Sequence, residues 1–269
     1  SVRKVYFISM IAMLLCLACE YKLKPSNDKQ DYSVEIQRYD RLARRYLTTG
    51  DFSALQQMNT NYPTETRTLI EDVLQIGEVN DPEINSKFLK FYQDTLLQTI
   101  IVDAETQYAN MDDINRDMDE AFRRLEKLVP NIELPVVYTQ VGALAQSVVI
   151  GNKMIGISLD KYLGKDYPLY KKFYSAQQRS TMTRDFIIPD CLSFYLLSIF
   201  PLKNYAGRTQ LEEDVHMGKV MWVTNEIMDR HFYDTRYVDM IDRYMKENKG
   251  LTVRGLFLSD NNRLIQNVE

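Results

Sequence analysis

The sequence predicts an α+β fold that is mostly helical, with a small central β-sheet. Apolar residues recur at helical spacing through much of residues 33–130 and again after residue 182. Between these stretches lie three short β-branched runs, LPVVYTQV, QSVVI and MIGISL, which are the strong strand signals. No linker rich in Gly, Ser or Pro divides residues 33–269, so we expect a single domain there.

Length and composition exclude several classes of protein. The chain has 269 residues, of which 45% are hydrophobic and 26% charged, a balance that excludes a disordered or low-complexity chain. Its formal charge is -4, which gives no electrostatic argument for a nucleic-acid partner. Three Cys and two His are few for metal or redox chemistry.

The N-terminal residues 1–18 are predicted to be a signal peptide. Arg3 and Lys4 form a short cationic region, and residues 5–18 carry no charge. A helix that spans a bilayer needs about 20 apolar residues, so this run is too short and has the length of a signal-peptide core. An ordinary cleaved signal and a short core helix are the alternatives.

The end of this segment resembles a bacterial lipobox. Leu17 and Ala18 precede Cys19, which would become the lipid-modified first residue and carry palmitate, although Cys16 stands where an aliphatic residue is usual. Residues 19–32 are then a polar tether. We expect a lipid-anchored protein of the cell envelope, at the outer membrane and facing the periplasm, that contacts the membrane through this lipid. Cys191 would be its other thiol.

The helices of the first half are read from periodicity and caps. A helix is expected from Ser33, as its cap, to just before Gly50, followed by a second in DFSALQQM. This hairpin looks somewhat like a tetratricopeptide repeat, but no second copy follows. Further helices are expected in EINSKFLKFYQDTLLQTII and in DDINRDMDEAFRRLEKLV, which Pro130 ends. The last has one apolar stripe, made of Ile114, Met118, Ala121, Phe122, Leu125 and Leu128.

The second half begins with the sheet and returns to helices. The residues 150–153, Ile-Gly-Asn-Lys, have the chemistry of a tight hairpin between the second and third strands. A helix apolar nearly all round is expected at about 182–200, stopped by Pro201, and it would be buried. Two more helices follow, in LEEDVHMGKVMWVTNEIMDRHF and TRYVDMIDRYMKEN.

Recognisable catalytic motifs are missing from the sequence. His216 and His231 do not form the i, i+4 pair of an HExxH zinc helix, and the pair Glu212 and His216 reads as a surface contact. No GxSxG or phosphate-binding glycine motif occurs, and Cys191 sits among apolar residues like an inert buried thiol. We therefore predict no catalytic residues, no metal and no cofactor.

Asp190 has two interpretations. It follows Pro189 at the start of an apolar helix, where a carboxylate in the first turn is favoured by the helix dipole. The alternative is a buried carboxylate paired with Arg184 or with a tyrosine, facing a cleft.

Tyrosines and lysines interleave in residues 161–174. This pattern is typical of an aromatic surface that contacts protein, whereas the low pI disfavours nucleic acid. The residues are Tyr162, Tyr167, Tyr170, Tyr174, Lys161, Lys165, Lys171 and Lys172.

The segment MIGISLDKYLGKDYPLYKKFY resembles the gliding-motility lipoprotein GldB family, whose signature is IG-x-x-LD-x-YLG-x-DYP-x-Y. The matching residues are Ile155, Gly156, Leu159, Asp160, Tyr162, Leu163, Gly164, Asp166, Tyr167, Pro168 and Tyr170. Flanking pieces agree in order: DFSALQQMNTNYP, IGEVNDPEI, PVVYT, FIIPD and HMGKVMWV. The likeness covers roughly residues 33–258, and the family usually continues beyond the position of Glu269 with a Gly-rich helical stretch.

The resemblance implies an exported envelope lipoprotein that is needed for movement in gliding species. The order of strands and buried helix also resembles a zincin metallopeptidase core, here without the metal motif because the helix RDFIIPDCLSFYL has no His. Our leading hypothesis is a non-enzymatic component of a gliding-motility or envelope secretion or assembly machinery that contacts other envelope proteins. The alternatives are a hydrolase or peptidase with a degenerate zincin site, and a helical-repeat adaptor without a sheet. Candidate positions for a functional cleft are Asp160, Tyr162, Asp166, Tyr167, Arg184 and Asp190.

Overall fold

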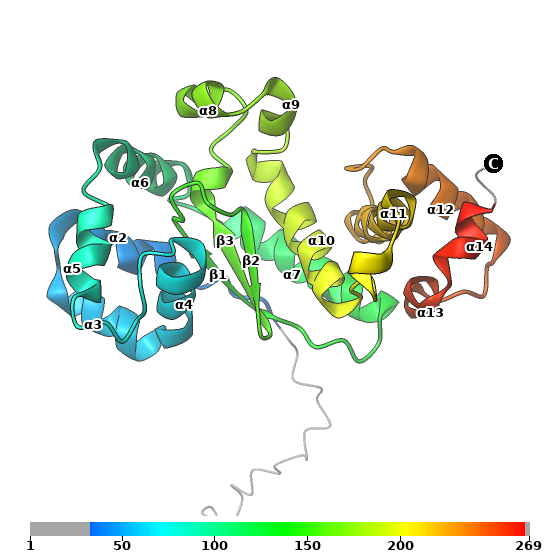
Figure 1. Cartoon of the computed structure of the whole chain (residues 1–269), viewed down its shortest axis with the longest axis horizontal. Helices are drawn as coiled ribbons and strands as arrows, with labels where there is room; N and C mark the ends of the chain where they lie inside the picture. The colour runs from blue at the N-terminus through cyan, green and yellow to red at the C-terminus, as the bar shows by residue number, and fades with distance from the viewer. Residues whose placement is uncertain (1–32, 267–269) are drawn as a thin grey trace, which may run out of the picture. The chain divides into compact units, whose positions relative to one another are not determined.

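A computed structural model describes residues 33–266 (Figure 1). The predicted signal peptide (1–18), the lipidated Cys19 and the tether (19–32) lie outside the described residues. Residues from Val34 onward form one compact unit, which is mostly helical and contains one three-stranded sheet. The predicted α+β fold is confirmed. The sheet excludes the alternative of a helical-repeat adaptor, which was expected to have no sheet.

Within the described residues, seven helical segments precede the sheet, and most of the predicted helices are among them. The DFSALQQM helix begins with its Asp51 carboxylate accepting two backbone N–H groups, and the first helix ends at Gly50 in the left-handed conformation. The segments are α2 (Tyr39–Thr49), α3 (Phe52–Asn61), α4 (Pro63–Arg67), the π-helical turn η1 (Thr68–Val73), α5 (Ile84–Phe91), α6 (Thr95–Gln107) and α7 (Asp112–Leu128).

The expected start of the first helix at Ser33 is wrong. Residues 33–38 are not helical; Val34 and Ile36 are buried alternately, and Gln37 pairs with the edge of the first strand at Tyr138. The Gln37 N–H donates to the Val137 carbonyl (2.9 Å) and its carbonyl accepts from Thr139 (3.0 Å). Two side chains on α7 accept further backbone N–H groups of this segment: Asp119 accepts that of Val34 (2.8 Å) and Asn115 that of Ile36 (2.7 Å). A strand-like leader therefore precedes α2.

Two further expectations need correction. The stretch EINSKFLKFYQDTLLQTII is two helices, because the Asp94 carboxylate accepts the N–H groups of Leu96 and Leu97 and starts α6. On α7 the apolar stripe is buried except at its last residue, Leu128, which is 37% exposed.

The sheet has the strand order β1-β3-β2. β2 (Val148–Gly151) and β3 (Met154–Ser158) form the predicted antiparallel hairpin, and β1 (Val136–Gln140) pairs with β3 in parallel. Gly156 lies opposite Tyr138, and a Cβ at Gly156 would come within 2.6 Å of the Tyr138 ring. The glycine of the signature thus leaves room for a buried tyrosine.

The second half packs around α10 (Ile187–Ile199), which contacts β2, β3, α7 and α11. It is buried on most of its faces, as its composition predicts. Gly218 lets α11 approach α12, because a Cβ there would come within 2.7 Å of Tyr237. The elements are η2 (Leu159–Lys161), α8 (Pro168–Phe173), α9 (Ala176–Arg179), η3 (Arg184–Phe186), α10, η4 (Tyr205–Gly207), α11 (Gln210–Met228), α12 (Arg236–Glu247), α13 (Val253–Leu258) and α14 (Asn261–Ile265).

The short helices α13 and α14 are not predicted from the sequence. Each has a capping side chain, Thr252 for α13 and Asp260 for α14. Within residues 33–266, no helix has both the length and the apolar character needed to cross a bilayer. The likeness to a zincin core stays a prediction.

Candidate functional site

A carboxylate and two tyrosine hydroxyls meet at the amino end of α10. The Tyr162 hydroxyl donates to Oδ2 of Asp190 (2.6 Å) and the Tyr233 hydroxyl donates to Oδ1 (3.3 Å). Asp190 lies in the first turn of α10 and is half-buried. Asp190 is therefore a first-turn acid whose partners are tyrosines, and the cleft that it was expected to face stays a prediction.

The loop after α11 brings Tyr233 to this place. The Asn225 amide oxygen accepts the N–H groups of Phe232 (3.0 Å) and Tyr233 (3.1 Å), and its Nδ2 donates to the Tyr233 carbonyl (2.8 Å). Asp229 ends α11 in the left-handed conformation and turns the chain back. The sequence analysis did not select Tyr233. This residue is far along the chain from Asp190, and only the fold of this loop brings the two side chains together.

Burial governs the titration of this cluster. It raises the pKa of Asp190 to about 6, against the opposing effect of the two tyrosine hydroxyls. Burial, together with the nearby carboxylate, also raises the pKa values of Tyr162 and Tyr233. Asp190 therefore changes charge in mildly acidic solution while both hydroxyls stay protonated.

Arg184 is not a partner of Asp190. Its guanidinium binds the Asp113 carboxylate at two points (2.6 and 3.1 Å), donates to the Asn110 carbonyl (3.0 Å) and lies over the Tyr108 ring. Arg184 thereby joins the segment before α10 to the start of α7. The hypothesis of an Arg184–Asp190 pair is wrong.

Asp160 is fully buried, and its carboxylate forms hydrogen bonds with backbone groups. Its carboxylate accepts the N–H groups of Gly142 (2.8 Å) and Leu144 (2.6 Å). Ala143 and Leu144 both have positive φ, so this carboxylate holds a loop in a conformation that L-residues seldom adopt. Burial raises the pKa of Asp160, while the two N–H groups act in the opposite direction.

The remaining tyrosines of the signature also hold chain segments together. The Tyr170 hydroxyl, fully buried, donates to the Asp160 carbonyl and accepts the Leu163 N–H (3.1 Å), and Tyr167 donates to the Asp103 carboxylate on α6 (2.6 Å). The expected aromatic contact surface is therefore wrong for Tyr162 and Tyr170, which are core residues. Asp166 is exposed.

His216 is buried, so the predicted surface contact with Glu212 is wrong. Its Nε2 lies 2.7 Å from the Phe200 carbonyl, while Glu212 accepts from Thr209 and Arg208. Burial lowers the pKa of His216. Cys191 is a buried free thiol, as predicted. Across residues 33–266, no group of three or more His, Cys, Asp or Glu side chains is placed to hold a metal ion.

Comparison with known protein families identifies a family that this chain matches. The sequence model of a family described as "Gliding motility protein GldB" matches residues 20–234. Neither the curated proteins nor the solved structures contain a match. The matched range includes the whole Asp190 cluster.

Proposed function

Because the chain belongs to the GldB family of gliding-motility lipoproteins, we propose that it is a non-enzymatic envelope protein that acts through contacts with other envelope proteins. The machinery would be one for gliding motility or for envelope secretion or assembly. The lipid on Cys19 would hold the protein at the outer membrane, facing the periplasm. Residues 20–33 would separate the anchor from the folded unit.

One observation carries this proposal: the signature residues are occupied in holding the fold together. Asp160 holds the Gly142–Leu144 loop, and Tyr170 ties the start of α8 to η2. Outside the signature, Arg184 in η3 joins the segment before α10 to the start of α7. Such residues make a rigid scaffold for a surface rather than a set of reactive groups around a substrate.

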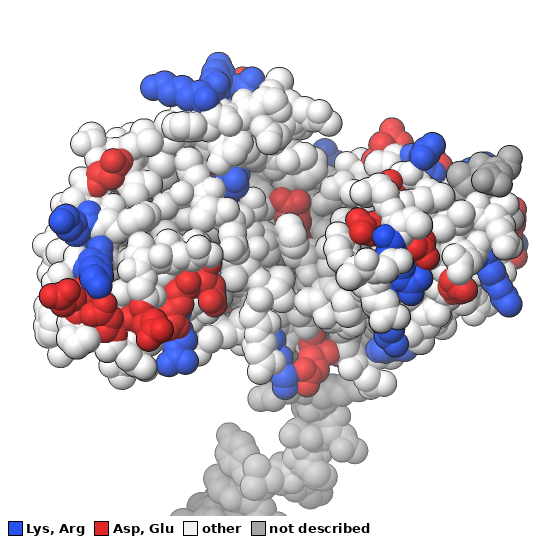
Figure 2. Space-filling model, in the orientation of Figure 1, with Lys and Arg blue, Asp and Glu red and all other residues white. Residues whose placement is uncertain are grey.

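The α8 helix offers a surface for such contacts. Phe173 is 62% exposed, and Lys165, Lys171 and Lys172 are exposed beside it. Basic side chains gather over this helix, at the top of Figure 2. An exposed aromatic ring among lysines suits a partner protein with an acidic rim around an apolar pocket.

Photo-crosslinking in intact cells tests this surface. A photoreactive phenylalanine at Phe173 is expected to crosslink to an envelope protein that mass spectrometry identifies. Phe52 on α3, which is 65% exposed, is the matched control and should not capture the same protein. Equal capture from both sites, or none from Phe173, would contradict the α8 surface.

The anchor is tested separately. Metabolic labelling with an alkyne-bearing palmitate should label the wild-type protein and not the Cys19→Ser variant. Labelling that survives the substitution would refute lipid attachment at Cys19.

The half-buried Asp190, with its raised pKa, favours a second candidate, a hydrolase-like site in which this acid exchanges a proton. Asp190→Asn separates the two functions in a motility or envelope assay. If the folded variant still complements a deletion strain, the hydrolase is excluded. Loss of complementation with unchanged crosslinking at Phe173 would favour the hydrolase over the contact protein.

A further inference from the structure

A cavity of about 570 Å³ lies between the end of α10, the start of α11 and the two last helices, α13 and α14. The volume lies within the range typical of sites for small molecules, roughly 300–1,000 Å³. The cavity is far along the chain from the GldB signature, and part of its wall lies beyond the matched residues 20–234.

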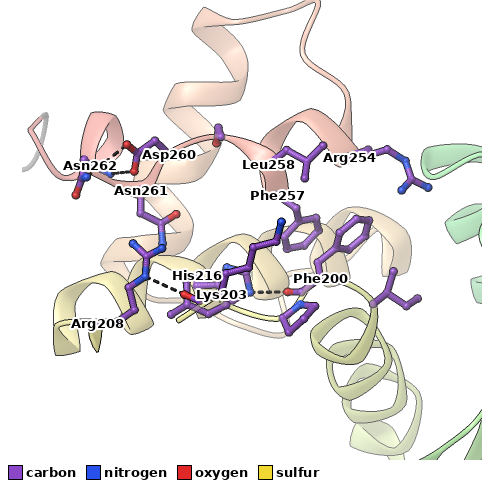
Figure 3. Close-up of a pocket in the computed structure, with 14 residues that line it drawn as sticks. Phe200, Lys203, Arg208, His216, Arg254, Phe257, Leu258, Asp260, Asn261 and Asn262 are labelled. Carbon is purple, nitrogen blue, oxygen red and sulfur yellow. Dashed lines mark hydrogen bonds between the residues drawn. The ribbon is translucent and has the colours of Figure 1, made fainter. Parts of the chain in front are cut away.

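Two stacked phenylalanines form an apolar wall of the cavity. The rings of Phe200 and Phe257 are 4.4 Å apart and nearly parallel, at 6°, and the His216 ring meets Phe257 edge-on. Figure 3 shows the two rings face to face, with Lys203 and Arg208 to one side and Arg254 to the other. Each side chain is 8% exposed, so a ligand can touch only a small part of the two rings. An aromatic ligand could pack edge-on against that part.

Cations surround this apolar wall. Lys203 and Arg254 are exposed and form no ion pair with any residue in 33–266, and the Arg254 guanidinium lies over the Phe200 ring. Arg208 is paired with Glu212 (3.0 Å). Asp260 also lines the cavity, but its carboxylate accepts the Asn262 N–H (3.0 Å) and caps α14. Two cations are thus left without a carboxylate partner.

A buried lysine behind the wall adds positive charge. Lys219 is fully buried, and its ammonium group donates to the Asn261 amide oxygen and to the Ser259 carbonyl (3.2 Å), both neutral acceptors. Buried charges in proteins are usually paired with opposite charges. Asp260 is the nearby carboxylate that favours the charged form of Lys219, whose pKa burial lowers to about 8. Lys219 does not line the cavity, so the anion site depends on Lys203 and Arg254.

The cavity walls are held in place without a ligand. The Asn261 amide donates to the Glu212 carbonyl (3.1 Å), which ties α14 to α11, and His216 fixes the end of α10 through the Phe200 carbonyl. A site that is already formed loses little conformational entropy on binding.

We propose that this cavity binds a small organic anion with an aromatic body. The ring would lie against the exposed part of Phe200 and Phe257, and the anionic group would be attracted by Lys203 and Arg254, which flank the two rings on opposite sides. The proposal concerns residues that the proposed envelope function does not use, so the two can fail independently.

Calorimetric titration of the full chain in detergent, with empty micelles as the blank, tests the site. Naphthalene-2-sulfonate is the probe, naphthalene-2-sulfonamide its uncharged counterpart, and inorganic sulfate the anion alone. Saturable binding of the sulfonate is expected, with both other compounds at least about tenfold weaker, since a hydrogen bond to a charged group contributes that much. Equal affinity for the sulfonamide would overturn the anion site, and equal affinity for sulfate would overturn the aromatic one.

Variants locate the binding. Lys203→Gln and Arg254→Gln should each raise the Kd for the sulfonate about tenfold. Lys127→Gln, an exposed lysine at the end of α7, is the matched control and should leave the Kd unchanged. Phe257→Leu removes a ring but no charge and should also weaken binding, with the Tm measured to verify folding. No saturable binding by the wild-type protein, or equal Kd values for all charge variants, would refute the site.

Discussion

Asp160 and Asp190 are two carboxylates whose pKa values are shifted in the same direction by burial but whose hydrogen-bond partners differ. Burial raises the pKa of both. Asp160 accepts two backbone N–H groups, whereas Asp190 accepts two tyrosine hydroxyls. An N–H can only donate, but a hydroxyl can turn and accept. An amide therefore cannot replace the carboxylate of Asp160 without losing a hydrogen bond, whereas it can replace that of Asp190.

The largest effect is expected for Asp160→Asn. The amide retains one acceptor oxygen, but its NH₂ would face a backbone N–H and leave a buried donor unsatisfied. Unfolding in urea should show a loss of about 3 kcal/mol. A loss below about 1 kcal/mol would show that the Gly142–Leu144 loop does not depend on this carboxylate.

Asn225→Ala should have the next largest effect. It removes the acceptor of two N–H groups and the donor to the Tyr233 carbonyl, and it releases the loop that carries Tyr233. We expect a loss of about 2 kcal/mol in the free energy of unfolding. Hydrogen exchange at Phe232 and Tyr233 should accelerate in this variant, while exchange at Gly142 and Leu144 stays slow.

Tyr162→Phe removes the shorter hydrogen bond to Asp190. The carboxylate keeps Tyr233 as a partner, so at pH 8 we expect a loss of about 1 kcal/mol. The same change should raise the pKa of Asp190, because the Tyr162 hydroxyl lowers it. An NMR titration of the Asp190 carboxyl carbon measures this shift, and an unchanged pKa would contradict the contact.

The smallest effect at pH 8 is expected for Asp190→Asn, within about 0.5 kcal/mol of wild type, because both hydroxyls can adapt to an amide. The informative measurement is the Tm as a function of pH. The pKa of Asp190 is about 6 in the folded protein, against an ordinary value of 3.8 for a free aspartate side chain, so the folded state holds the proton more tightly. The stability this proton contributes is present below pH 4 and is lost as the pH rises from about 4 to 6. The variant should lack this decline in Tm.

Local patterns in the sequence were sufficient to predict most elements. The stripe on α7, the Asn152–Lys153 turn and the apolar α10 all follow from spacing or composition within one segment. The leader before α2 was misread because Ile36 and Tyr39 also fit a helical period. Its non-helical form depends on hydrogen bonds to β1 and α7, which lie far along the chain.

The candidate site was predictable only in part. Asp190 was selected because a charged residue in an apolar helix stands out, and Tyr162 because it is a position of the family signature. Their pairing, the exclusion of Arg184 and the arrival of Tyr233 all depend on how η2, α10 and α11 pack. No local pattern distinguishes a tyrosine that bonds an acid from one that fills the core.

The non-helical leader has a mechanical consequence. A protein anchored through Cys19 would receive any pull between membrane and partner at Val34, the first residue of the compact unit. The pull would load the hydrogen bonds of Val34 and Ile36 to α7 and those of Gln37 to β1. Since these bonds lead to two different elements, tension on the tether would be shared between a helix and the sheet edge before α2 could unwind.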